Sequence, residues 1–276
     1  MGIAFLKGHG TQNDFVLLPD PDGRLELSAD RVRALCDRRR GLGADAVLRV
    51  VRTAALGTDV AGVTGEWFMD YRNADGSIAE MCGNGVRVFA RYLVDAGLVT
   101  AAEFVVGSRA GDRPVQVHHD RSVTVHMGAT QITGKSTATV AGDEFSGVAV
   151  DVGNPHLVSV IDLDVGGLDL REQPSFDHGF FPHGVNLEFI NRLGPGTLRM
   201  RVHERGVGET RACGTGTVAA VAADLHLACE VAGARTVHVP GGTVVVTVEP
   251  GASTLTGPAV ILASGELDSA WWEEPA

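Results

Sequence analysis

The chain lacks an excess of basic charge, and this absence narrows its possible partners. Its 276 residues include 23 Lys and Arg against 34 Asp and Glu, for a formal net charge of −11. Nucleic-acid binding draws its affinity from clustered Lys and Arg, so we expect no nucleic-acid partner. The one basic run, at residues 38–40, precedes a glycine and is interpreted as a solvated helix end.

Long apolar runs are also missing. No stretch approaches the roughly 18 residues that span a bilayer, and the longest is the alanine-rich run at residues 217–223. The N-terminal segment MGIAFLKGHG has no apolar core of the kind found in secretory signals. We therefore expect a cytoplasmic protein that does not associate with membranes.

Cysteine is scarce, with four residues and no CxxC pair or Cys/His spacing typical of zinc. Because cytosolic thiols stay reduced, we expect neither a structural disulfide nor a metal site. Cys36 lies in an amphipathic stretch and Cys229 in an alanine-rich one, so both are interpreted as small buried hydrophobes. Cys82 and Cys213 differ because each stands in a Cys-Gly-x-Gly element.

These two elements belong to a diverged internal repeat. Each is followed by apolar residues at i, i+3, i+4 and i+7, the spacing of one buried helix face. Polar positions keep the same spacing in both halves: Asn13 to Asp45 and Asn154 to Asn186 are 32 residues apart, and Asn73 to Cys82 and Glu204 to Cys213 are nine apart. A 276-residue chain also suggests two domains.

Strand patterns surround the two predicted helices. Leu198, Met200 and Val202 alternate with arginines, and β-branched runs flank Pro240-Gly241-Gly242 as in a hairpin. The sequence therefore predicts an α+β fold of two pseudosymmetric domains. Each would be a curved, mostly antiparallel β-structure wrapped around a central α-helix, and helix 217–223 would be buried nearly all round.

The Cys-Gly-x-Gly elements also predict chemistry. The N-terminus of a helix favours an anion, which lowers a thiol pKa from about 8.5, and the glycines let backbone N–H groups approach a carboxylate. Two thiols related by a repeat suit epimerisation, in which a base removes the α-hydrogen from one face and an acid returns a proton to the other. Alternatively, both elements are helix starts inherited by duplication, which explains the glycines but not a cysteine in each copy.

The residues around these elements resemble diaminopimelate epimerases over nearly the whole chain. The matching segments are residues 7–15 (KGHGTQNDF), 41–45 (GLGAD), 73–76 (NADG), 81–85 (MCGNG), 153–156 (GNPH), 184–186 (GVN) and 203–216 (HERGVGETRACGTG). The resemblance implies interconversion of LL- and meso-diaminopimelate, a step towards lysine and peptidoglycan precursors, without pyridoxal phosphate or metal. It also implies a homodimer, with the active site in the cleft between the domains. The expected domains are residues 1–128 with 257–276, and residues 129–256.

The resemblance also implies roles for individual residues. The proton donor and acceptor map onto Cys82 and Cys213, assisted by His156 and Glu204. Substrate contacts map onto Asn13, Asn73, Gly83, Asn84, Asn154, Asn186, Glu204, Arg205, Gly214 and Thr215. One position departs from the family, because Ala46 stands where many members have a substrate-contacting Gln.

Two other functions stay open at this point. A proline-racemase-type enzyme would also use two cysteines, on a smaller substrate, although Glu204 and Arg205 favour a substrate with a second charged end. A non-catalytic amino-acid-binding module is the other alternative, and the two retained cysteines argue against it. A phenazine-pathway-like isomerase of similar fold would lack the cysteine pair.

Overall fold

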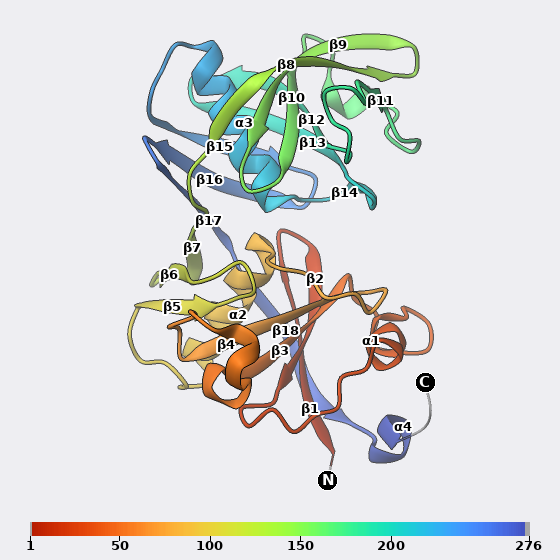
Figure 1. Ribbon diagram of the computed structural model, residues 1–276, viewed down its shortest axis with the longest axis vertical. Coiled ribbons are helices and arrows are strands. Elements are labelled where there is room, and N and C mark those ends of the chain that lie inside the picture. Colours follow the sequence, from red (N-terminus) through yellow and green to blue (C-terminus); the bar gives the residue numbers. More distant parts are fainter. Residues whose placement is uncertain (1, 274–276) are drawn as a thin grey trace. The chain divides into compact units, whose positions relative to one another are not determined.

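The computed structural model describes residues 2–273 and divides into two compact units (Figure 1). The first unit ends at Val125 and resumes at Pro258, and the second is His126–Gly257. The chain passes from one unit to the other within two strands, β7 (Ser122–His126) and β17 (Ala252–Pro258). In the described part of the chain, no helix is both long and apolar enough to span a bilayer.

The first unit is a sheet that curves around the helix α2. Its strand order is β18-β1-β2-β3-β4-β5-β6-β7, in which β2–β3 and β4–β5 are parallel and the other pairs are antiparallel. The remaining bounds are β1 Ile3–Gly10, β2 Asn13–Pro19, α1 Ala29–Cys36, β3 Ala46–Arg52, β4 Trp67–Asn73, α2 Gly83–Asp95, β5 Glu103–Gly107, β6 Arg113–Val117, β18 Val260–Leu267 and α4 Ser269–Glu273, with 3₁₀ turns at Thr53–Ala55 and Gly57–Val60.

The second unit repeats this order around the helix α3. Strands β8-β9-β10-β12-β13-β15-β16-β17 follow one another, in which β10–β12 and β13–β15 are parallel and the other pairs antiparallel. The remaining bounds are β8 Gln131–Val140, β9 Asp143–Asp151, β10 Pro155–Val160, β11 Ser175–Phe176, β12 Asn186–Gly194, β13 Thr197–Glu204, β14 Gly208–Thr210, α3 Gly214–Leu227, β15 Gly233–Val239 and β16 Gly242–Glu249, with a 3₁₀ turn at Val165–Gly167. The matching order of parallel and antiparallel pairs confirms the repeat and the α+β class.

The two central helices form the cores of their units. The predicted apolar positions of α2 and α3 are buried, and each large apolar side chain contributes about 1.5–3 kcal/mol by leaving water. Residues 217–223 are buried all round, as predicted. In α2, however, Arg87 and Arg91 are buried as well, so the expectation of one apolar face was incomplete. The curved sheet encloses more of α2 than its hydrophobic pattern shows.

The two remaining cysteines have different surroundings. Cys36 is buried in the cluster that contains Val32 and Leu35, as predicted. Cys229 is exposed, so its assignment to a core was wrong. The reason is that α3 ends at Leu227, and Cys229 takes the left-handed conformation (φ 59°) in the turn that follows.

Candidate functional site

In the first unit, Cys82 occupies the N-cap position of α2 and is half-buried. Its Sγ lies 3.5 Å from Asn13 Oδ1, and Asn84 Nδ2 lies 3.4 Å from the same oxygen. Asn13 donates its own Nδ2 to Asp45 Oδ2 over 2.9 Å, which turns the amide oxygen towards the sulfur. The structure therefore brings together three of the predicted residues, Cys82, Asn13 and Asn84.

A charged network anchors this half-site from the β1–β2 side. Arg38 pairs with Asp14 and Asp45 at 2.8 Å each, and Lys7 pairs with Asp14 at 2.5 Å. Burial by itself would raise the pKa of Asp14, but hydrogen bonds from Arg38 and Lys7 lower it to about 2. Arg38 is thus exposed, as expected of the basic run, but it also fixes the carboxylate that orients Asn13.

The other predicted residues of this half lie in the neighbouring turn and loop. Asn73 ends β4 and donates Nδ2 to Ser77 Oγ over 3.0 Å. Gly83 begins α2, and its carbonyl accepts from Arg87 at 3.4 Å. Ala46 is fully buried opposite Asn73 in the β3–β4 pair, so it supplies no side-chain hydrogen bond where many family members have Gln.

In the second unit, Cys213 occupies the equivalent N-cap position of α3 but is buried. Its Sγ accepts from the Gly216 N–H over 3.4 Å and lies 3.6 Å from Thr215 Oγ1. Asn154 reaches the same hydroxyl with Nδ2 over 3.5 Å, and its Oδ1 lies 3.0 Å from His156 Nε2. A chain of polar contacts therefore connects His156 to the thiol through Asn154 and Thr215.

Glu188, which the sequence analysis did not single out, completes this half-site. Its side chain is fully buried on β12, with Oε1 2.7 Å from His156 Nδ1 and with Oε2 lacking a hydrogen-bond partner among the described residues. In this geometry Nδ1 of His156 faces a carboxylate oxygen and Nε2 faces an amide oxygen, so both ring nitrogens have a polar partner. The signal available in the sequence was an acidic residue between the apolar Leu187 and Phe189, two residues after Asn186.

The charge around Cys213 reverses one expectation. Burial, followed by the negative charges of Glu204 and Glu188, raises the pKa of the Cys213 thiol well above its ordinary value. Hydrogen bonds from the Thr215 hydroxyl and the Gly216 N–H act in the other direction but are outweighed. The helix N-terminus therefore does not lower this thiol pKa as predicted, because loss of water and two nearby carboxylates dominate.

Glu204, at the end of β13, is the other group that faces this thiol. Burial raises the pKa of its carboxyl group, against hydrogen bonds from Thr210 and Cys213. A carboxyl group with a raised pKa can exchange a proton with a neighbouring thiol near neutral pH.

Backbone contacts occupy the amide of Asn186. Its Nδ2 donates to the Pro155 carbonyl over 2.9 Å, and its Oδ1 accepts from the Arg205 N–H over 3.0 Å. The guanidinium of Arg205 is exposed and lies 3.4 Å from the His183 carbonyl, and Gly214 begins α3. Among the described residues, no cluster of three or more His, Cys, Asp or Glu side chains could hold a metal ion.

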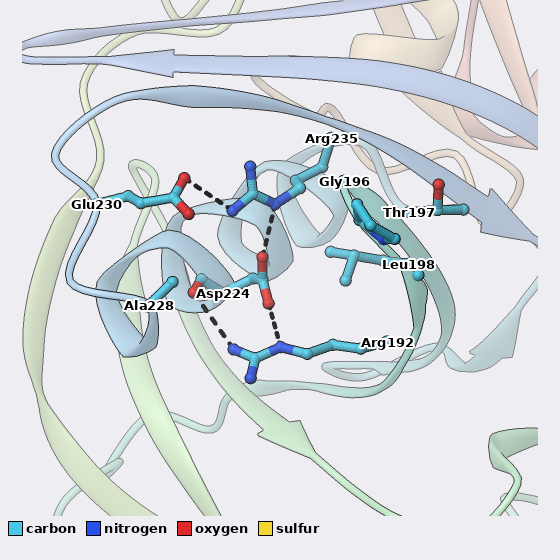
Figure 2. Close-up of a pocket in the computed structure, with 10 residues that line it drawn as sticks. Arg192, Gly196, Thr197, Leu198, Asp224, Ala228, Glu230 and Arg235 are labelled. Atoms are coloured by element: carbon cyan, nitrogen blue, oxygen red, sulfur yellow. Dashed lines mark hydrogen bonds and ion pairs between the residues drawn. The ribbon is translucent and has the colours of Figure 1, made fainter.

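A surface recess of about 220 Å³ lies away from these residues, at the C-terminal end of α3 (Figure 2). Asp224 is held there by Arg192 at 2.6 Å and Arg235 at 2.7 Å, and Arg235 also pairs with Glu230 at 3.0 Å. These charges satisfy one another and anchor the helix to its sheet. The recess is therefore not the candidate site.

Solved structures share the fold at low sequence identity. A PhzF-family phenazine biosynthesis protein of Bacillus anthracis superimposes with a TM-score of 0.68 at 17% identity, covering 97% of this chain and 99% of that one. A hydroxyproline epimerase of Agrobacterium vitis gives a TM-score of 0.65 at 15% identity, covering 96% and 92%. These likenesses show the architecture alone.

Sequence comparisons are more specific. The family model for diaminopimelate epimerase matches residues 5–133 and 148–262. A diaminopimelate epimerase of Rhodococcus opacus is 58% identical over 287 residues, covering 98% of this chain and 99% of the relative. One of Mycobacterium tuberculosis is 55% identical, with the same coverage. The chain thus belongs to the diaminopimelate epimerase family.

Proposed function

We propose that this protein interconverts LL- and meso-diaminopimelate by two-base proton transfer between Cys82 and Cys213. The observation that carries the proposal is the equivalent placement of the two thiols, each at the N-cap of the buried central helix of its unit. The family match and the names of the relatives support the substrate. A thiolate removes the α-hydrogen, and the other sulfur, as a thiol, returns a proton from the opposite face.

The N-terminal turns of α2 and α3 suit the α-carboxylate of the substrate. Backbone N–H groups at Gly83, Asn84, Gly214 and Thr215 lie at helix starts, where first-turn donors and the helix dipole favour an anion. Neutralising this carboxylate makes the α-hydrogen easier to remove. The proposed reaction requires one sulfur on each face of the substrate α-carbon.

The charges of the second half-site suit Cys213 as the proton donor. Its raised pKa keeps it a thiol in the absence of substrate, which leaves Cys82 to act first as the base. In the opposite direction, Glu204 can accept the thiol proton through their hydrogen bond. His156 acts through Asn154 and Thr215 to orient this thiol.

The remaining polar residues are proposed to bind the substrate. Amide groups can donate to a carboxylate and accept from an ammonium without adding net charge near the thiols. The exposed guanidinium of Arg205 offers a planar fork for the remote carboxylate. The proposed substrate ligands are Asn13, Asn73, Asn154, Asn186, Glu204 and Arg205.

The wider setting of the reaction is also a proposal. The product would serve lysine and peptidoglycan precursor synthesis in the cytoplasm, and four cysteines that form no disulfide among the described residues suit a reducing compartment. A homodimer is supported by the family resemblance, and light scattering of the purified protein measures it directly.

Deuterium exchange tests the reaction. Reduced protein is incubated with LL-diaminopimelate in heavy water, and NMR follows α-deuteration and the isomer ratio. We expect both to proceed to equilibrium, and we expect Cys82→Ala and Cys213→Ala each to slow epimerisation by about 10²–10⁴-fold. Cys229→Ala, at an exposed thiol outside both half-sites, is the matched control and should keep full activity.

The same assay separates the alternatives. Exchange of proline or hydroxyproline in preference to diaminopimelate would indicate a proline-racemase-type enzyme. Calorimetric binding of diaminopimelate without any α-deuteration would indicate a binding module, and either result would overturn the proposed reaction.

A further inference from the structure

A buried arginine in the first half-site has no carboxylate partner among the described residues. Arg87 lies one turn into α2 and is fully buried. Its guanidinium donates to four neutral oxygens: Asn84 Oδ1 at 2.8 Å, Thr11 Oγ1 at 3.1 Å, and the carbonyls of Pro258 at 3.2 Å and Gly83 at 3.4 Å. Within residues 2–273, no carboxylate lies within ion-pair distance of it.

The next turn of the same helix shows the ordinary arrangement. Arg91 is also buried, but its Nε lies 2.9 Å from both carboxylate oxygens of Asp95. Burying an unpaired charge is strongly unfavourable, so the lone charge of Arg87 calls for a compensating partner. The charge of Arg91 is therefore neutralised by a carboxylate, whereas the charge of Arg87 is not, although the two arginines share a helix and a core.

The group whose negative charge acts on Arg87 is the thiolate form of Cys82. Burial lowers the pKa of Arg87 to about 10, whereas the negative charge of Cys82 raises it. A guanidinium with this pKa remains charged at neutral pH. Because Coulomb attraction acts equally on both partners, a thiolate that favours the guanidinium is itself favoured by it.

Hydrogen bonds also link Arg87 to Cys82. Arg87 and Thr11 hold Asn84 by its amide oxygen, at 2.8 and 3.2 Å, so its Nδ2 points the other way. That Nδ2 donates to Asn13 Oδ1, the same atom that faces Cys82 Sγ. Without the guanidinium, the Asn84 amide loses the shorter of the two hydrogen bonds that fix this orientation.

We propose that Arg87 is a positioning residue for Cys82, which holds the Asn84 amide with its N–H groups towards the site and favours the thiolate with its unneutralised charge. The second unit has no such group, because the repeat places Val218 at the equivalent position. The significance of this for catalysis rests on the proposed function, but the state of the thiol is measurable without substrate.

Site-resolved alkylation tests the role of Arg87. Full-length protein is treated with iodoacetamide from about pH 5.5 to about pH 10, a range that includes the ordinary pKa of a thiol. Mass spectrometry gives the alkylation rate for each cysteine peptide. We expect Arg87→Met and Arg87→Gln to raise the pH midpoint for Cys82 by about one pH unit or more, which slows alkylation about tenfold at a pH below both midpoints. Arg87→Lys, which keeps the charge, should recover at least half of that change.

Two controls separate this role from a structural one. Arg91→Met removes a buried arginine of the same helix whose charge is neutralised, so it should lower the unfolding temperature without moving the Cys82 midpoint. The exposed Cys229 serves as an internal reference in every sample. An unchanged Cys82 midpoint in folded Arg87→Met or Arg87→Gln would overturn the proposal.

The wild-type protein provides an outcome that does not depend on the variants. Its Cys82 midpoint is expected below that of Cys229, and a midpoint at or above it would contradict the proposal even if no Arg87 variant folds. Failure of the proposed function appears separately, as absence of α-deuteration, because alkylation requires no substrate.

Discussion

The two units share a strand order and a thiol position, but the groups behind their sulfurs differ in charge. Leu17 faces Leu48 in the β2–β3 pair, and Val158 faces Glu188 in the equivalent β10–β12 pair. An apolar residue in the first unit thus corresponds to a buried carboxylate in the second. By the same correspondence, Phe15 occupies the place of His156.

This difference shows which properties the repeat preserved. Backbone order, the helix N-cap and the sulfur are common to both units, and the proposed two-base reaction requires these shared features. The charges diverged: a guanidinium with no carboxylate partner among the described residues acts on Cys82, whereas two carboxylates act on Cys213. In the proposed reaction one sulfur starts as the base and the other as the acid, and the unlike surroundings suit these two roles.

Replacing the buried carboxylate of the second unit with an apolar residue, as in the first unit, should have the largest effect on stability. Glu188→Leu leaves His156 without its carboxylate, and we expect a loss of about 3–5 kcal/mol in denaturant unfolding. The double variant Glu188→Leu with His156→Phe removes both partners and should recover a large part of that loss. If the double variant loses as much free energy of unfolding as Glu188→Leu and His156→Phe lose in sum, the pair does not act as a unit.

The glycines after the two cysteines provide a sharper test of the same difference. A Cβ added at Gly216 would lie 2.4 Å from Glu188 Oε1, whereas one at Gly85 would lie 3.3 Å from Leu48 Cδ2. We expect Gly216→Ala to destabilise by about 1–3 kcal/mol. Gly85→Ala should be within about 1 kcal/mol of neutral, because Leu48 can shift and alanine favours a helix. Thermal unfolding of both variants measures this, and equal losses would contradict the comparison.

Removing one negative charge from the second half-site should make its thiol more reactive. Glu204→Gln is expected to lower the pH midpoint of Cys213 alkylation, because Glu204 is the larger of the two charges that raise its pKa. A midpoint lower by about one pH unit makes alkylation about tenfold faster at a pH below both midpoints, which corresponds to about 1.4 kcal/mol. Cys82 in the same sample serves as the reference, and a rise in the Cys213 midpoint would refute the assigned charge effect.

The two units should also respond oppositely to pH, with effects of about 1 kcal/mol after allowing for solvent screening. The pKa of Asp14 is lowered to about 2, so its stabilisation is present above pH 4 or so and is lost as the pH falls towards 2. The pKa of Glu204 is raised in the folded protein. Stability therefore falls as the pH rises from the ordinary pKa of a glutamate to the raised pKa of the folded state.

Unfolding curves for Asp14→Asn and Glu204→Gln measure these slopes. Asp14→Asn should be less stable than wild type at neutral pH and should converge with it in acid. Glu204→Gln should become more stable relative to wild type as the pH rises. Parallel curves for either variant would show that its carboxyl group titrates alike in the folded and unfolded chains.

Much of the architecture could be predicted because it depends on local patterns. The spacing of Val86, Phe89 and Leu93 predicted α2, and the matched positions of Cys82 and Cys213 predicted the repeat. The exposure of Cys229 could not be predicted, because the alanine-rich run continues in composition beyond the point where α3 ends. Burial of Arg87 was likewise missed, because a charged residue gives no sign of enclosure in a hydrophobic pattern.

The sequence by itself determined the two-unit α+β fold, the pair of cysteines and their glycine-rich helix starts, because spacing, periodicity and turn chemistry are properties of neighbours along the chain. Only the tertiary structure decided the charge on each half-site. Pairing of β10 with β12 brings Glu188 to His156, packing of α3 brings the Glu188 charge to Cys213, and Arg87 loses its solvent when the sheet curves around α2. The pKa of a thiol depends on water and on charges that lie close to it in space. The residues that carry those charges can lie tens of residues away along the chain.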